Sequence, residues 1–139
     1  MALGRLADRV RFAVHRDIGR RGEDMAHRFL RQRGFIVVAR NWSPPQGGGE
    51  IDLVAWDGDT LVFVEVKSRV SQDKSSPERA IDPEKITSLR RAARDYIRRT
   101  GTGESKTRFD AIAIAGEEID YLADAFGASA VDSNGAQRI

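Results

Sequence analysis

The sequence predicts an α/β fold, because segments with the periodicity of helices alternate with segments that have the character of strands. Apolar residues recur at helical spacing over residues 23–32 and 83–100. The apolar run at 35–42 and the period-two alternation within 50–67 are typical of strands, and a further strand-like segment lies at 107–114. The expected order is therefore helix, three strands, helix, strand.

The composition is that of one folded domain. The chain has 139 residues, 40% of them hydrophobic, which is sufficient for a single core. We expect the domain to cover 19–126, after a basic helical extension at 1–18 and before a flexible tail at 127–139. The lack of cysteine excludes disulfides and thiolate metal sites, and no apolar run has the length of a membrane span. We expect a cytoplasmic protein with no membrane partner.

The basic residues are mostly arginines. The sequence contains 19 Arg and 4 Lys, at a net charge of only +2, and one cluster lies between Arg90 and Arg99. A guanidinium group is a planar fork that suits phosphate, so we consider Arg90, Arg94 and Lys85 as nucleic-acid contacts. The same charges are also compatible with a solvated helix face or with the codon preference of a GC-rich genome.

The first helix is predicted to follow a break at 19–22 and to end at Gly34, which suits a C′ position. Glu23 lies three residues before Ala26 and seven before Leu30, so it falls on or beside the apolar face of this helix. It is therefore either a residue of the site or a first-turn acid that interacts with the helix dipole.

A strand and a loop come next. The apolar run at 35–42 suggests a strand that is buried on both sides. The segment 43–49, SPPQGGG, cannot continue a strand and must be a loop. This loop either borders a substrate channel or is a plain connector.

Residues 50–67, EIDLVAWDGDTLVFVEVK, are predicted to form a β-hairpin. A two-residue turn centred on Gly58-Asp59 would place Asp52 opposite Glu65 on one face of the sheet. A turn at Asp57-Gly58 would make the relation diagonal, at roughly 7 to 8 Å between Cβ atoms. A three-residue loop would send the two carboxylates to opposite faces, because one step of register reverses every side chain.

Two carboxylates on one face need a cation, because a buried pair repels itself and its pKa values rise. Mg²⁺, a hard ion that prefers oxygen ligands, suits Asp52 and Glu65 and could activate a water for attack on a phosphate. Lys67 follows Glu65 on the same face and could orient that water. The alternative without a metal site is an exposed sheet face with a salt bridge between Glu50 and Lys67.

The second helix has clear start and stop signals. Asp82 is a suitable N-cap, Pro83 suits the first helical position, and Gly101 follows the last turn. Lys85, at its start, could point back towards the polar end of the hairpin. The strand at 107–114, in which Asp110 is expected to be a strand-end residue with local hydrogen bonds, precedes a short edge strand at 118–122.

The order of elements, with GEIDLVA followed by FVEVKSR, resembles the restriction-endonuclease-like or PD-(D/E)xK nuclease fold. That fold has an αβββαβ core with a mixed central sheet flanked by helices. More narrowly, the chain resembles the small bacterial YraN family, which is similar to archaeal Holliday-junction resolvases. The resemblance covers about 19–126.

The resemblance implies roles for individual residues. It makes Asp52 and Glu65 the metal-binding acids, Lys67 the lysine of the ExK motif, Glu23 the first-helix acid that completes the site, and Glu50 an accompanying acid. The implied function is an endonuclease that uses Mg²⁺ or Mn²⁺ to hydrolyse DNA, including branched DNA, and a resolvase would act as a homodimer. The alternatives are a nucleic-acid-binding module of the same fold without catalysis and a scaffold protein with no nucleic-acid role.

Overall fold

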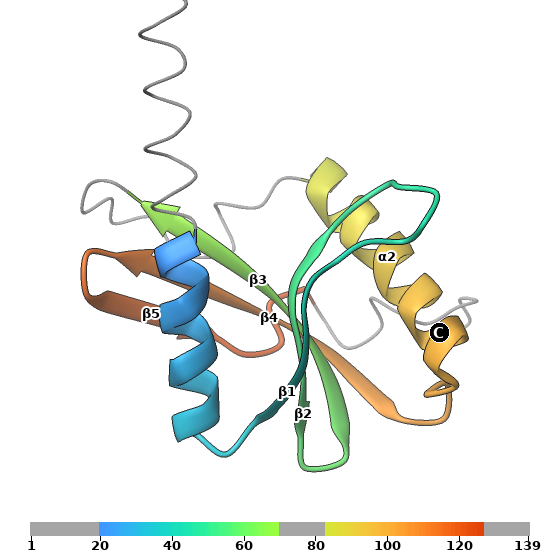
Figure 1. Ribbon diagram of the computed structural model, residues 1–139, viewed down its shortest axis with the longest axis horizontal. Coiled ribbons are helices and arrows are strands. Elements are labelled where there is room, and N and C mark those ends of the chain that lie inside the picture. Colours follow the sequence, from blue (N-terminus) through green and yellow to red (C-terminus); the bar gives the residue numbers. More distant parts are fainter. Residues whose placement is uncertain (1–19, 70–82, 127–139) are drawn as a thin grey trace, which may run out of the picture.

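The computed structural model describes residues 20–69 and 83–126, which form one five-stranded sheet and two helices (Figure 1). Residues 20–32 are helical, and the remaining elements are β1 (Ile36–Trp42), β2 (Ile51–Asp57), β3 (Thr60–Arg69), α2 (Pro83–Thr100), β4 (Lys106–Ala115) and β5 (Glu118–Leu122). This order confirms the predicted α/β class and the αβββαβ core. The expected extension at 1–18 and tail at 127–139 lie outside the described residues.

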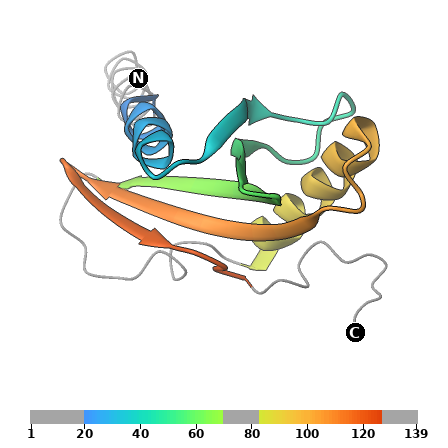
Figure 2. The ribbon, with the colours of Figure 1, turned by 90° about the horizontal axis from the view of Figure 1, so that it is seen from below.

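The sheet is mixed, as expected. Its strands follow the chain, β1-β2-β3-β4-β5, and every neighbouring pair is antiparallel except β3 and β4. Parallel strands need a long crossover connection, and the connection between β3 and β4 contains α2. The first helix and α2 stand at opposite ends of the twisted sheet in both views (Figure 2).

Each helix packs against its own part of the sheet and completes a separate hydrophobic core. The α2 core consists of buried residues from the helix and from β2, β3 and β4: Ile51, Val54, Leu61, Phe63, Leu89, Ala92, Ala93, Tyr96 and Phe109. The core of the first helix consists of Ala26, Leu30, Phe35, Leu53, Ala55, Val62, Val64, Ile112 and Ile114. β2 and β3 contribute to both cores, so their side chains are buried on both faces of the sheet. The two helices therefore hold the β2–β3 hairpin between them.

β1 is an edge strand, and the prediction that it is buried on both sides was wrong. Ile36 and Val38 are 65% and 47% exposed. Among the strands of the described residues, β1 pairs with β2 alone, and its register slips between Val37 and Ala39. Val38 is thus the extra residue of a β-bulge, a feature that is common at sheet edges.

Gly22 lies inside the first helix, so the predicted break at 19–22 was wrong for residues 20–22. A Cβ at this position would overlap Oγ of Ser68 in β3. Gly22 therefore lets the helix approach β3 closely. Gly34, with φ of +93°, follows the helix at the predicted end.

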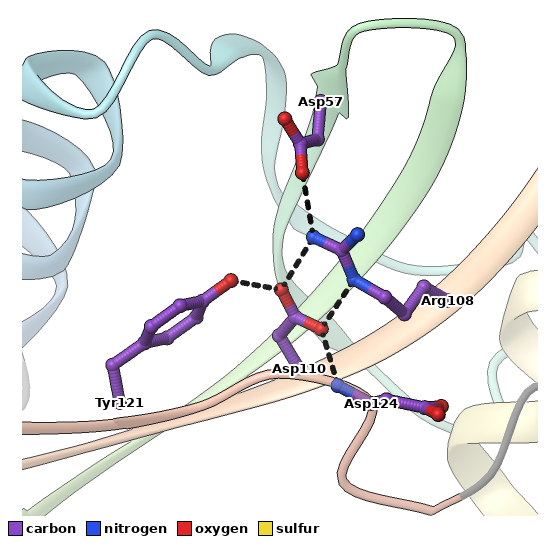
Figure 3. A network of polar contacts seen from close by, with 5 residues as sticks. All are labelled: Asp57, Arg108, Asp110, Tyr121 and Asp124. Atoms are coloured by element: carbon purple, nitrogen blue, oxygen red, sulfur yellow. Dashed lines mark hydrogen bonds and ion pairs between the residues drawn. The ribbon is translucent and has the colours of Figure 1, made fainter.

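A polar network around the buried Asp110 joins β2, β4, β5 and the segment after β5 (Figure 3). Asp110 is 0% exposed and accepts hydrogen bonds from Arg108 Nε at 2.9 Å, the Tyr121 hydroxyl at 2.6 Å and the Asp124 backbone N–H at 2.9 Å. The Arg108 guanidinium also donates to Asp57 at the end of β2, at 3.0 Å. Asp110 lies in the middle of β4, so its expected place at a strand end was wrong. Its partners satisfy both carboxylate oxygens, which marks the network as structural.

The helices of the described residues are too short or too polar to cross a membrane.

Candidate active site

The turn of the β2–β3 hairpin consists of Gly58 and Asp59, as the first of the two predicted registers required. Gly58 adopts φ of +62°, which is typical of glycine in tight hairpin turns. Strand pairing runs from Asp57 opposite Thr60 to Leu53 opposite Val64. Continuing this register by one step brings Asp52 to the level of Glu65. The hairpin therefore places both carboxylates on one face.

The two strands separate at the acids. Beyond Leu53, the ladder of β2 and β3 ends, and the Val66 N–H donates instead to Oδ2 of Asp52 at 2.8 Å. β3 continues to pair with β4 as far as Arg69, whereas β2 remains paired with β1 at Ile51. The Asp52 carboxylate thus occupies the fork between the diverging strands.

Asp52 and Glu65 are both buried, at 9% and 4% exposure. Burial raises the pKa of Asp52 to about 8, and the nearby Glu65 charge acts in the same direction. Burial also raises the pKa of Glu65, although the positive charges of Lys85 and Lys67 act against this. Without a further cation, the pair does not carry two full negative charges at neutral pH.

Lys85 supplies one positive charge to this pair. Its Nζ, from the first turn of α2, lies 3.3 Å from Oε2 of Glu65. Partial burial by itself would lower the pKa of Lys85, but Glu65, Asp52 and Glu50 together raise it. Lys85 therefore remains protonated, and the expectation that it points back towards the hairpin is confirmed.

The second oxygen of Glu65 has no such partner. Oε1 is buried and forms no hydrogen bond in the described part of the chain. An unpaired buried carboxylate oxygen is costly, and hard divalent ions such as Mg²⁺ and Mn²⁺ prefer oxygen ligands of this kind. Asp52 and Glu65 therefore fit such an ion.

Glu23 lies near the pair without joining it directly. Its charge raises the pKa of Asp52, but its Oε1 is 3.8 Å from the guanidinium of Arg40, which also pairs with Asp24 at 2.8 Å. Over 20–69 and 83–126, no group of three or more His, Cys, Asp or Glu side chains is arranged to hold a metal ion. The structure thus brings Asp52 and Glu65 together and leaves Glu23 within electrostatic reach.

Lys67 and Glu50 are exposed and lie within electrostatic reach of the site. Lys67 follows Glu65 by two residues on β3, is exposed, and lowers the pKa of Glu65 through its charge. Glu50 is also exposed and lies directly before β2. Its negative charge raises the pKa of Lys85. The site therefore has a buried acidic pair, a lysine from α2 and a second lysine at the solvent boundary.

The arginines of α2 have different surroundings. Arg90 is half-buried, and its Nε is buried without a hydrogen-bond partner in the described residues. Arg94 is exposed and, together with Arg91 and Arg98, lines a cavity of about 310 Å³ beside residues 44–48. Arg91 and Arg98 belong to the arginine cluster that the sequence indicated between Arg90 and Arg99, and their spacing from Arg94 places all three on one side of the helix.

The chain matches a protein family described as "Uncharacterised protein family UPF0102" over residues 22–114. A "UPF0102 protein" of Solibacter usitatus is 50% identical over 128 residues, which cover 89% of this chain and 97% of that protein. A "UPF0102 protein" of Dictyoglomus thermophilum is 39% identical, over 81% of this chain and 98% of the relative. The matched segment contains Glu23, the β2–β3 hairpin and α2.

Proposed function

Given that the chain belongs to the UPF0102 family, whose description states no reaction, we propose that it is a metal-dependent nuclease acting on DNA, including branched DNA such as a four-way junction. The observation that carries this proposal is the buried pair of Asp52 and Glu65, with an unpartnered oxygen on Glu65 and two lysines beside it. The same arrangement suits a divalent ion and an anionic substrate together.

In this proposal Asp52 and Glu65 bind Mg²⁺ or Mn²⁺, and Glu23 adds negative charge from the first helix. A bound divalent ion would lower the pKa of a water molecule and stabilise charge on the phosphate. The reaction adds the water oxygen to phosphorus and breaks one P–O ester bond, which leaves a phosphate monoester and a free hydroxyl group. The resemblance to PD-(D/E)xK nucleases supports the same assignment.

The two lysines have separate tasks. Lys67 is exposed at the edge of the pair, where its ammonium group can donate to a phosphate oxygen or orient the attacking water. Lys85 holds Oε2 of Glu65 and so fixes the direction in which the other oxygen of that carboxylate points. Both acids are on strands of the central sheet, a rigid support for such a site. A four-way junction has two equivalent strands, so resolution would require a homodimer.

The ion pair between Lys85 and Glu65 favours a second candidate, a nucleic-acid-binding module without catalysis. In this case Lys85 neutralises Glu65 permanently, and the acids serve the fold. Binding to DNA would then depend on salt but be insensitive to Asp52 and to divalent ions.

The two functions are separated by cleavage assays with Mg²⁺ or Mn²⁺ on labelled single strands, duplexes, flaps and four-way junctions. We expect Asp52→Asn and Glu65→Gln to reduce the rate by about 100-fold or more, since each removes a ligand that acts on developing charge. Asp120→Asn, which changes an exposed acid of β5, is the matched control. Equal activity of the wild type and Asp52→Asn on every substrate would contradict catalysis at this site.

Binding of Mn²⁺ provides a test that does not depend on the choice of DNA. Calorimetric titration of the wild type should show heat of binding that is lost in Asp52→Asn and retained in Asp120→Asn. A wild-type protein that takes up no Mn²⁺, with or without DNA, would favour the binding module.

A further inference from the structure

A cationic cavity lies beside α2, away from the acidic pair. It has a volume of about 310 Å³ and lies between residues 44–48 and the helix. Three of its lining residues are Arg91, Arg94 and Arg98, at positions i, i+3 and i+7 of α2. Arg91 and Arg94 are exposed and form no ion pair or hydrogen bond with the described residues. Two guanidinium groups at this cavity are therefore available to an anion.

The third arginine is held in place by a buried acid. Asp95 also lines the cavity and accepts hydrogen bonds from Arg98 and, at 2.7 Å, from Nε of Arg99. The hydrogen bond from Arg99 and the charges of both arginines lower the pKa of Asp95, so it stays ionised. Arg98 is thus oriented before any ligand arrives, which reduces the entropy cost of binding.

Glycines form the opposite wall. Gly47 and Gly48 line the cavity with φ of +84° and +95°, and have no side chain that could cover the arginines. Gly49, with φ of +127°, lies so close to α2 that a Cβ would come within 2.9 Å of the Ser88 carbonyl oxygen. The loop is therefore fitted to the helix through glycine, and the cavity depends on this close approach.

We propose that the cavity formed by residues 44–48 with Arg91, Arg94 and Arg98 binds a backbone phosphate of the DNA whose cleavage is proposed above. The inference rests on that proposed function and adds a second point of contact to it. The chemistry favours phosphate, because three arginines line the cavity and Asp95 is the one acidic residue among its described lining residues.

The position of the cavity sets the length of DNA that can use it. Lys85 marks the acidic pair, and a rise of about 1.5 Å per residue places Arg91 and Arg98 about 9 and 20 Å further along α2. Since one DNA strand carries a phosphate about every 3.4 Å of helix axis, this distance corresponds to about three to six nucleotides. A strand bound at both points must be at least this long.

The test measures binding of a fluorescein-labelled duplex of about 20 bp by fluorescence anisotropy. EDTA is present so that no cleavage occurs. The variant Arg91→Gln/Arg94→Gln removes two charges from the cavity. Arg20→Gln/Lys106→Gln removes two exposed charges elsewhere and is the matched control. We expect the cavity variant to bind about tenfold more weakly, with a reduced salt slope, and the control to change Kd by less than about threefold. Equal weakening in the two variants would overturn the proposal.

Gly49→Ala tests the shape of the cavity without changing its charge. We expect it to weaken binding as well, because the new methyl group displaces the loop from Ser88. Thermal melts of both the alanine and the double arginine variant show whether the fold is retained. Unchanged DNA affinity in a folded Gly49→Ala protein would count against a cavity built by the loop.

Two further comparisons are needed. The first distinguishes a DNA site from a site for free phosphate, and the second distinguishes the failure of this inference from the failure of the nuclease proposal. If the cavity binds inorganic phosphate tightly while the double arginine variant retains full affinity for DNA, the proposal is overturned. If the cavity variant binds and cleaves DNA like the wild type while Asp52→Asn is inactive, the inference fails and the nuclease stands. If the wild type binds DNA and loses affinity only in the cavity variant, yet never cleaves, the inference stands and the nuclease fails.

Discussion

The ammonium group of Lys85 lies 3.3 Å from one carboxylate oxygen of Glu65 and so links the first turn of α2 to β3. The other oxygen of the same carboxylate is buried and has no hydrogen-bond partner in the described residues. Lys85 thus neutralises one oxygen of Glu65, whereas Asp52, at the same level of the hairpin, keeps a raised pKa. The electrostatic state of the site depends on this division.

Replacing Lys85 by Met should shift that balance. Glu65 would lose its nearest positive charge, so its raised pKa would rise further. An acid whose pKa is higher in the folded than in the unfolded state contributes stability at low pH and loses it as pH rises. We therefore expect Lys85→Met to lower the Tm by about 2 to 4 °C at pH 8 and by less than half of this at pH 5.

The same variant should bind Mn²⁺ several-fold more tightly than the wild type, because a competing positive charge has been removed. Lys106→Met, which changes an exposed lysine at the start of β4, is the control for both measurements. Identical pH profiles and Mn²⁺ affinities for the two variants would show that Lys85 does not act on the pair.

Asp52→Asn should stabilise the metal-free protein at alkaline pH. Burial raises the pKa of Asp52 to about 8, from an ordinary value near 4, so ionisation disfavours the folded state. The wild type should lose stability between about pH 4 and pH 8, whereas the amide of Asn does not ionise in this range. The gain at pH 8.5 should be on the order of a few kcal/mol, and the difference should nearly vanish at pH 4.

Urea denaturation at several pH values, in EDTA, measures this effect, and Asp120→Asn serves as the exposed control. Added Mn²⁺ should reverse the order, because only the wild type gains stability from the bound ion. A constant difference between wild type and Asp52→Asn across this range would mean that Asp52 does not titrate as a buried acid.

The hairpin was the most predictable part of the molecule. The period-two alternation on both sides of residues 57–59 predicted the two strands, and the turn at Gly58 and Asp59 was one of three that the sequence left open. The pairing of Asp57 with Thr60 selects that turn and so sets the level of Asp52 and Glu65. The edge position of β1 was not predictable in this way. Its apolar run looks like an interior strand, and only the order of the whole sheet shows that Ile36 and Val38 are exposed.

Contacts between distant segments also could not be predicted from the sequence. Asp110 is bonded to Tyr121 and Asp124, 11 and 14 residues further along the chain, and these depend on how β5 pairs with β4. The arginine cavity likewise depends on where residues 44–48 meet α2. In both cases the residue types were visible, but the partners were set by tertiary packing.

Asp110→Asn should destabilise the fold strongly. Arg108 would keep its contact with Asp57 at 3.0 Å but would lose the negative charge of Asp110, its fully buried partner. Breaking a buried ion pair typically costs about 3 to 5 kcal/mol. Tyr121→Phe removes one hydrogen bond to the same carboxylate and should cost about 1 to 3 kcal/mol.

Denaturant unfolding of the two variants, beside Asp120→Asn in the neighbouring strand, measures these values. We expect their effects to be non-additive in the double variant, because both act on one carboxylate. Wild-type stability in Asp110→Asn would mean that the network contributes nothing to the fold.

Gly22→Ala tests how closely the first helix must approach the sheet. An alanine in the middle of a helix is normally favoured over glycine by about 1 kcal/mol. Here the new Cβ would overlap Oγ of Ser68, so the hydroxyl must rotate and give up its present interaction, and we expect this cost to cancel the gain or to exceed it by up to about 1 kcal/mol. Ser68→Ala removes the overlapping oxygen, so the double variant should be more stable than the two single effects predict when summed. A double-mutant cycle in urea measures this coupling, and additive effects would show that the helix adjusts freely against β3.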